Sequence, residues 1–92
     1  MTVKRWKLII SGRVQGVSYR ASAEAQANEL GILGYARNLA DGRVEIVAEG
    51  NDNQLGELES WCRKGPPAAA VNSVDAEEQE ATGEFTGFGI RR

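Results

Sequence analysis

The sequence predicts an α+β fold in the order β-α-β-β-α-β, with one antiparallel sheet and both helices on a single face of it. Apolar and polar residues alternate along four segments, which is the pattern of strands with one buried face. Two further segments repeat their apolar residues every three or four positions, as amphipathic helices do. The connections between these segments are short, and right-handed crossovers through short connections favour this topology.

The first strand and the first helix lie on either side of a glycine-containing loop. The strand is predicted over residues 3–12. Its apolar face carries Trp6, Leu8 and Ile10. The helix follows the loop and ends at Leu30, and Gly31 is placed to stop it in a left-handed conformation. Its residues at helical spacing are Tyr19, Ala23, Ala27 and Leu30.

The middle of the chain predicts a β-hairpin. Two strands are expected over residues 33–39 and 43–49, joined by the tight-turn pair Asp41-Gly42. In the second of these strands the residues expected to face the core are Val44, Ile46 and Ala48. The alternation places Glu45 and Glu49 on the opposite face, where they are expected to meet water.

The second helix is predicted to begin after Asn51, because Asn51 and Gln54 three residues later have the pattern of a capping box. Its apolar stripe consists of Leu55, Leu58, Trp61 and Cys62. Arg63 and Lys64 in the last turn suit the negative end of the helix dipole. The run Gly65-Pro66-Pro67 ends this helix.

The last third of the chain predicts a long strand and a short one. The long strand begins near Val71 and continues through an acidic segment to Glu80. A turn is expected over residues 83–87, and Phe88 and Ile90 then form a short final strand. This element order is that of the ferredoxin-like sandwich, with a short extra strand at the C-terminus.

Length and composition indicate one folded domain over residues 1–92. The formal net charge is −2, which argues against nucleic acid or an anionic membrane surface as the main partner. The single cysteine, Cys62, excludes an internal disulfide and fits a reducing compartment. No apolar run is long enough for a membrane span or a signal peptide. A small cytoplasmic protein is therefore expected.

The segment from Ser11 to Arg20 predicts a site for an anion. Gly12 and Gly16 permit positive φ, so successive main-chain N–H groups can turn toward one point. The first turn of the helix adds its own unpaired N–H groups, and Arg20 adds a forked guanidinium. The candidate binding residues are Gln15, Gly16, Val17, Ser18, Tyr19 and Arg20. The alternative is that the loop is only a strand-to-helix turn.

The residue inventory excludes several kinds of catalysis. The chain has no histidine, so a histidine base and nucleophiles of the Ser-His or Cys-His kind are excluded. Cys62 falls on an apolar helix face and is interpreted as a buried hydrophobic residue. The acidic residues Asp75, Glu77, Glu78 and Glu80 are interpreted as a solvated strand edge. Asn51-Asp52-Asn53 does not continue as a calcium loop, because Arg63 occupies its twelfth position. No metal and no cofactor are predicted.

Asn38 is the candidate partner of the loop. It lies toward the carboxyl end of the second strand, which runs parallel to the first, so both can face one end of the sheet. Asn38 could orient a water for phosphoryl transfer, or it could bond only local main chain. Without a general acid the leaving group must depart unprotonated, and a carboxylate does so because its conjugate acid has a pKa of about 4. The substrate class indicated is a mixed carboxylic–phosphoric anhydride.

Two blocks of the sequence resemble the signature blocks of the acylphosphatases, namely residues 12–20 (GRVQGVSYR) and 31–38 (GILGYARN). Further landmarks of the family resemble residues 41–45, 49–50, 65–71 and 87–92. The resemblance implies a ferredoxin-like fold and hydrolysis of acyl phosphates without a metal or a covalent intermediate. It assigns phosphate binding to Arg20 and orientation of the water to Asn38. Ser18 departs from the larger residue that the family often has there.

Two other functions are compatible with the fold. An RNA-recognition module is one, but its aromatic strand motif is missing and the chain is acidic. A regulatory or maturation domain that handles carbamoyl phosphate is the other, because similar blocks occur at the start of larger hydrogenase-maturation proteins. The expected ligands are an acyl phosphate and, as product-like anions, phosphate or sulfate. The expected oligomeric state is a monomer.

Overall fold

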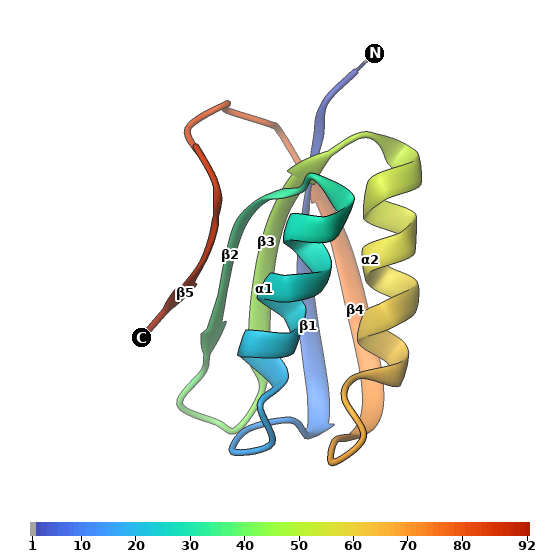
Figure 1. Cartoon of the computed structure of the whole chain (residues 1–92), viewed down its shortest axis with the longest axis vertical. Coiled ribbons are helices and arrows are strands. Elements are labelled where there is room, and N and C mark those ends of the chain that lie inside the picture. Colours follow the sequence, from blue (N-terminus) through green and yellow to red (C-terminus); the bar gives the residue numbers. More distant parts are fainter. Residues whose placement is uncertain (1) are drawn as a thin grey trace.

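The computed structural model of the chain describes residues 2–92. Its elements are β1 (Lys4–Arg13), α1 (Tyr19–Leu30), β2 (Leu33–Asn38), β3 (Val44–Gly50), α2 (Asp52–Lys64), β4 (Ala70–Gln79) and β5 (Phe88–Arg91). Figure 1 shows both helices on the same face of one sheet. The predicted ferredoxin-like order, with a short extra strand at the end, is confirmed.

The strands are arranged in the order β4-β1-β3-β2-β5. β1 lies antiparallel to β3 and β4, and β2 lies antiparallel to β3. β1 and β2 therefore run in the same direction, which brings their carboxyl ends to one end of the sheet. The final strand adds a parallel pair, because the chain leaves β4 running opposite to β2 and reverses before it reaches the far edge. The sheet is consequently mixed.

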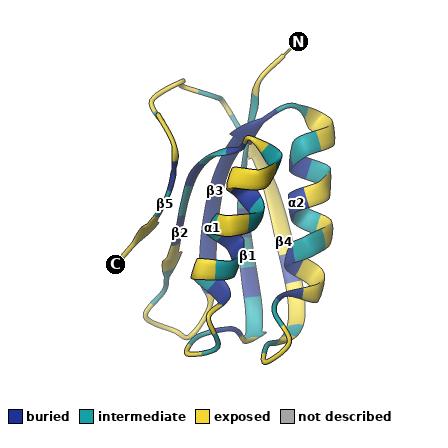
Figure 2. Ribbon diagram, in the orientation of Figure 1, coloured by how far each residue is buried: buried dark blue, intermediate teal, exposed yellow. Residues whose placement is uncertain are grey.

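The core lies between the helices and the sheet, and Figure 2 shows buried residues on the faces that meet there. Its largest fully buried side chains are Tyr19, Leu8, Ile10, Ile32, Ile46, Leu55 and Leu58. Burial of one such side chain contributes about 1.5–3 kcal/mol. The Tyr19 hydroxyl donates to the carbonyl of Cys62 at 2.8 Å, and this bond joins the start of α1 to the end of α2.

The helix boundaries follow the predicted caps. Gly31 ends α1 with φ 76°, in the left-handed conformation that glycine adopts without steric cost. Asn51 and Gln54 form both bonds of a capping box at the start of α2, each 2.8 Å long. Gly34 in β2 has φ 144°, and a Cβ there would lie 1.9 Å from the carbonyl oxygen of Val47. This glycine therefore permits close pairing of β2 with β3.

The prediction that Glu45 and Glu49 face water is wrong. Glu45 is 7% exposed and Glu49 is 2% exposed. All of β3 is buried because it is the central strand of the sheet. Glu49 accepts from the guanidinium of Arg5 at 2.8 Å and from the amides of Thr82 and Gly83. The loop after β4 thus crosses the face of the sheet that the helices leave open. Burial of the two carboxylates is tolerated because each has partners.

Candidate active site

The loop between β1 and α1 contains two residues with positive φ, Gly16 at 74° and Ser18 at 63°. Ser18 is the N-cap of α1, but its side chain makes no capping bond. The first main-chain bond of the helix runs from the amide of Ser22 to the carbonyl of Ser18 at 3.0 Å. The amides of the first turn therefore have no acceptor within the helix and are available to an anion.

Gly12 has a structural role that differs from the predicted one. Its φ is 122°, and a Cβ there would lie 2.2 Å from the carbonyl oxygen of Ala70. The register between β1 and β4 shifts between Ser11 and Gly12. This glycine thus permits an irregularity in the sheet that directs the chain into the loop, whereas Gly16 belongs to the loop itself.

A cavity of ≈ 170 Å³ lies between this loop, the end of β2 and β5. It is lined by Val14, Gly16, Ser18, Tyr19, Arg20, Ala21, Asn38 and Ile90. The structure thus brings Arg20 and Asn38 together, although they are 18 residues apart in the sequence. Within residues 2–92 the Oδ1 atom of Asn38 is buried and has no hydrogen-bond partner. A buried acceptor without a partner is costly, and a bound water or ligand group would satisfy it.

Gln15 and Val17 are not among the residues that line this cavity. The side-chain amide of Gln15 donates to the carbonyls of Leu39 and Arg43, at 2.8 and 2.9 Å. Val17 packs against the hydrophobic core. Their side chains therefore fix the loop in place, and only their main-chain groups remain candidates for contact with a ligand.

Sequence reasoning missed the contribution of β5 to this cavity. Ile90 lines it, and the guanidinium Nη1 of Arg20 donates to the main-chain carbonyl of Arg91 at 3.1 Å. The only signal in the sequence was the resemblance of the last six residues to a family landmark. Nothing in the spacing of those residues indicated that they would meet the first turn of α1.

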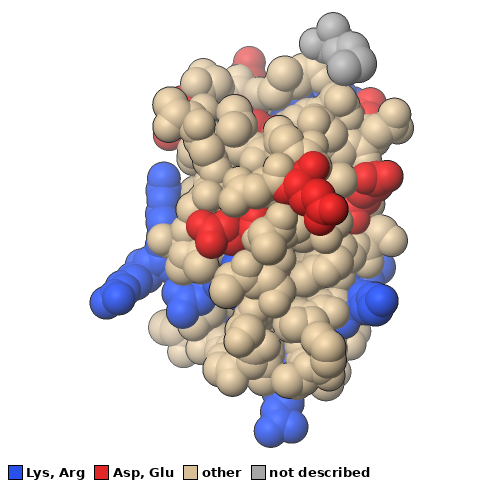
Figure 3. All heavy atoms as spheres, viewed as in Figure 1, with Lys and Arg blue, Asp and Glu red and all other residues tan. Residues whose placement is uncertain are grey.

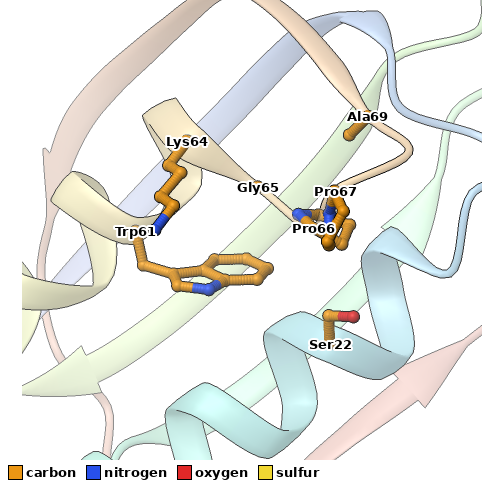
Figure 4. A pocket seen from close by; sticks show the side chains of 7 residues that line it. All are labelled: Ser22, Trp61, Lys64, Gly65, Pro66, Pro67 and Ala69. Carbon is orange, nitrogen blue, oxygen red and sulfur yellow. The ribbon is translucent and has the colours of Figure 1, made fainter.

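A larger and more open hollow of ≈ 550 Å³ lies between the two helices (Figure 4). Its lining consists of Ser22, Trp61, Lys64, Gly65, Pro66, Pro67 and Ala69. Apart from the ammonium of Lys64, the hydroxyl of Ser22 and the indole N–H of Trp61, this surface is apolar or main chain. The smaller cavity combines a guanidinium, a side-chain amide and free helix amides, so the smaller cavity is the candidate active site.

The charges are distributed unevenly over the helical face. In Figure 3 the carboxylates lie mostly in the upper half of the view, whereas Lys and Arg lie along the left and right edges and at the bottom, the end at which the loop is located. A positive potential at that end favours an anionic substrate.

Burial raises the pKa of the Cys62 thiol to about 12, so the thiol stays protonated near neutral pH and is a poor nucleophile.

Two further properties of residues 2–92 bear on function. No group of three or more Cys, Asp and Glu side chains lies close enough together to hold a metal ion. None of the helices in this part of the chain has the length and hydrophobicity needed to cross a membrane.

The fold and the cavity define a class of protein, a small α+β sandwich with an anion-sized cavity at the carboxyl ends of β1 and β2. The acylphosphatase family model matches residues 6–90. An acylphosphatase of Marinobacter nauticus is 59% identical over 88 residues, which cover 96% of each chain. A solved acylphosphatase structure from Coxiella burnetii has a TM-score of 0.91 at 37% identity and covers 97% of this chain and 93% of its own. One from Bacillus subtilis has a TM-score of 0.93 at 31% identity and covers 99% and 100%.

The chain belongs to the acylphosphatase family, whose function is the hydrolysis of acyl phosphates. The family and fold class that the sequence motifs indicated are confirmed. The Marinobacter relative bears the acylphosphatase name and is matched over 96% of its own length. A binding or regulatory domain with little activity of its own is therefore not favoured.

Proposed function

We propose that the protein hydrolyses the carboxyl–phosphate bond of an acyl phosphate by direct in-line attack of water, with Arg20 and Asn38 as the catalytic residues. The observation that carries this proposal is that Asn38 lines the same cavity as Arg20 and that, within residues 2–92, its buried Oδ1 has no hydrogen-bond partner. A carboxamide oxygen accepts a hydrogen bond from an O–H donor, and water, the nucleophile that the reaction requires, is such a donor. Asn38 would accept a hydrogen bond from this water and direct its lone pair at phosphorus.

The phosphoryl oxygens would be bound by the guanidinium of Arg20 and by main-chain amides of the loop from Gln15 to Arg20. Phosphoryl transfer depends mainly on positioning and on stabilisation of negative charge, and these groups supply both. The helix N-terminus adds partial positive charge at the same place. Phosphate, the product, and sulfate of similar shape would bind in the same position.

The leaving carboxylate needs no general acid, because its conjugate acid has a pKa of about 4. This property matches a cavity that offers no histidine and whose nearest thiol is buried and protonated. The proposed reaction is therefore independent of a metal ion or a cofactor. Alkyl and sugar phosphates have more basic leaving groups, and they would react slowly here.

We also propose that residues 1–92 act as one domain in a cytoplasmic monomer. The free thiol of Cys62 fits a reducing compartment. In residues 2–92 the large exposed hydrophobic side chains are Val3 and Ile90, which are too few for a stable apolar interface. Sedimentation at micromolar concentration would test the monomer.

The test compares turnover of acetyl phosphate, carbamoyl phosphate and a simple alkyl phosphate, with and without a chelator of divalent cations. We expect fast hydrolysis of acetyl phosphate, no effect of the chelator, and little hydrolysis of the alkyl ester. Carbamoyl phosphate as the only efficient substrate would favour the maturation function. Loss of activity with the chelator, restored by a divalent cation, would overturn the metal-independent mechanism.

A further inference from the structure

We propose that Tyr35 is a positioning residue for Arg20 and acts through the C-terminal strand. The ring of Tyr35 makes a cation–π contact with the side chain of Arg91. The main-chain carbonyl of Arg91 accepts a hydrogen bond from the guanidinium of Arg20. The inference rests on the proposed function, in which Arg20 binds the phosphoryl group. It adds a residue outside the cavity to the machinery that keeps the cavity in its binding geometry.

The orientation of Arg20 depends on few contacts. Within the described chain no carboxylate lies within salt-bridge distance of Arg20. Its Nη1 donates to the carbonyl of Arg91 at 3.1 Å. A guanidinium has five N–H donors, so this bond leaves four free for an anion. A neutral acceptor fixes the side chain without neutralising the charge that the phosphoryl group would meet.

The carbonyl of Arg91 lies in a strand that is weakly held by the sheet itself. β5 has four residues, forms the edge of the sheet and pairs only with β2. Figure 1 shows it ending at the C-terminus beside β2. Chain ends fray unless side chains tie them down. The guanidinium of Arg91 lies 3.9 Å from the centre of the Tyr35 ring, which is a cation–π contact of this kind.

The register of the two strands directs Arg91 toward Tyr35. Arg91 pairs with Arg37 across the ladder, and like charges directly opposite one another are unfavourable. Arg37 is neutralised by Glu45, which accepts from its Nε at 2.7 Å. Tyr35 is two residues before Arg37 on the same face, so Arg91 reaches it diagonally.

Tyr35 is itself held from two further directions. Its ring meets the edge of Phe85 with centroids 5.9 Å apart. Its hydroxyl donates to Oε1 of Glu45 at 3.3 Å. The ring is therefore a fixed platform between the loop after β4 and the central strand, and Arg91 rests on that platform.

The experiment compares Tyr35→Leu with Tyr35→Phe, using the inhibition constant of inorganic phosphate and the kinetic constants for acetyl phosphate. For Tyr35→Leu we expect the inhibition constant and KM to rise roughly two- to five-fold, with a smaller change in kcat. Tyr35→Phe keeps the ring and is expected to match the parent. A variant that merely unfolds in part would lower kcat and leave KM and the inhibition constant unchanged, and that result would overturn the proposal.

Arg91→Leu removes the stacked cation but keeps the main-chain carbonyl. It should weaken phosphate binding as much as Tyr35→Leu does, and the double variant should be no weaker than either single one. Independent, additive losses would contradict the proposed link.

Arg20→Gln separates this inference from the proposed function. If Arg20→Gln weakens phosphate binding and Tyr35→Leu does not, only the role of Tyr35 is wrong. If Arg20→Gln has no effect, the binding role of Arg20 is wrong as well.

Discussion

The side-chain amide of Gln15 donates to the main-chain carbonyl of Leu39, the residue after Asn38, at 2.8 Å. A second bond from the same nitrogen reaches the carbonyl of Arg43 at 2.9 Å. The loop after β1 is thereby tied to the hairpin that carries Asn38. These two bonds help to fix the position of the proposed phosphate site relative to the proposed water site.

Replacement of Gln15 by Met keeps the volume but removes both bonds. We expect the free energy of unfolding to fall by about 1 kcal/mol, because two hydrogen bonds are lost while the carbonyls of Leu39 and Arg43 each keep a main-chain donor. We expect KM for acetyl phosphate to rise several-fold, because the loop is no longer fixed relative to Asn38. Steady-state kinetics and chemical denaturation measure the two effects. Gln79→Met, at a half-buried site on β4 outside the cavity, is the matched control, and an equal rise in KM there would contradict the role of Gln15.

Arg20→Gln is expected to weaken binding of inorganic phosphate by about 10- to 100-fold, the range for loss of charge-assisted hydrogen bonds. Arg20→Lys keeps the charge but loses the fork, so it should recover only part of the affinity. Calorimetric titration with phosphate measures both. Arg13→Gln makes the same change of charge at an exposed residue outside the cavity, and it should bind phosphate nearly as the parent does.

Asn38→Ala is expected to lower kcat by about 10²–10³-fold, the usual cost of losing a positioned polar group at a reacting centre. Phosphate affinity should stay close to that of the parent. The variant should also be as stable as the parent or more so, because the substitution removes a buried acceptor that has no protein partner. Parent-level turnover would remove Asn38 from the mechanism, and thermal unfolding reports the stability.

Glu49 is expected to make stability depend on pH. Burial alone would raise its pKa, but the amide of Thr82 and the guanidinium of Arg5 outweigh burial and lower the pKa below the ordinary value of 4.5. Stability from this group is therefore present above about pH 4.5 and is lost as pH falls toward the lowered pKa. Glu49→Gln should be about 2 kcal/mol less stable than the parent at pH 7. This difference should shrink in acid, because there the parent loses the contribution of the charged carboxylate. Denaturant unfolding at several pH values tests this, and a pH-independent difference between the two proteins would contradict it.

Ser18→Gly is expected to stabilise the protein by about 0.5–1 kcal/mol. Ser18 has φ 63°, which is strained for a residue with a Cβ, and its side chain makes no capping bond that the change would lose. Ser22→Gly, inside α1, should instead destabilise by about 0.5 kcal/mol. Thermal unfolding of the two variants is the measurement, and equal shifts for both would show that the strain is absent.

Local patterns were sufficient to predict most of the fold. Gly31 and the Asn51–Gln54 pair mark helix ends because each acts on main chain within a few residues of itself. The alternation in β1 is readable because only one face of that strand is buried by the helices. The resemblance also allowed Arg20 and Asn38 to be paired as candidates, and the structure places both at one cavity.

The features that were missed depend on contacts between distant segments. Glu49 can be buried because Arg5 and the loop after β4 supply its hydrogen-bond donors. These partners lie more than 30 residues away in the sequence. The contact between Arg20 and Arg91 spans 71 residues and requires the chain to cross the sheet first. The left-handed backbone at Ser18 is imposed by the loop, since serine has no preference for it. No periodicity in the sequence encodes these relationships.

The position of β4 at the outer edge of the sheet has a consequence for how copies of the protein meet. One side of this ten-residue strand has no neighbouring strand, which is the arrangement from which fibrils can grow. Asp75, Glu77 and Glu78 are exposed along it. A second molecule that tried to add its own β4 would bring carboxylates against carboxylates, so mutual repulsion protects the protein from templated aggregation.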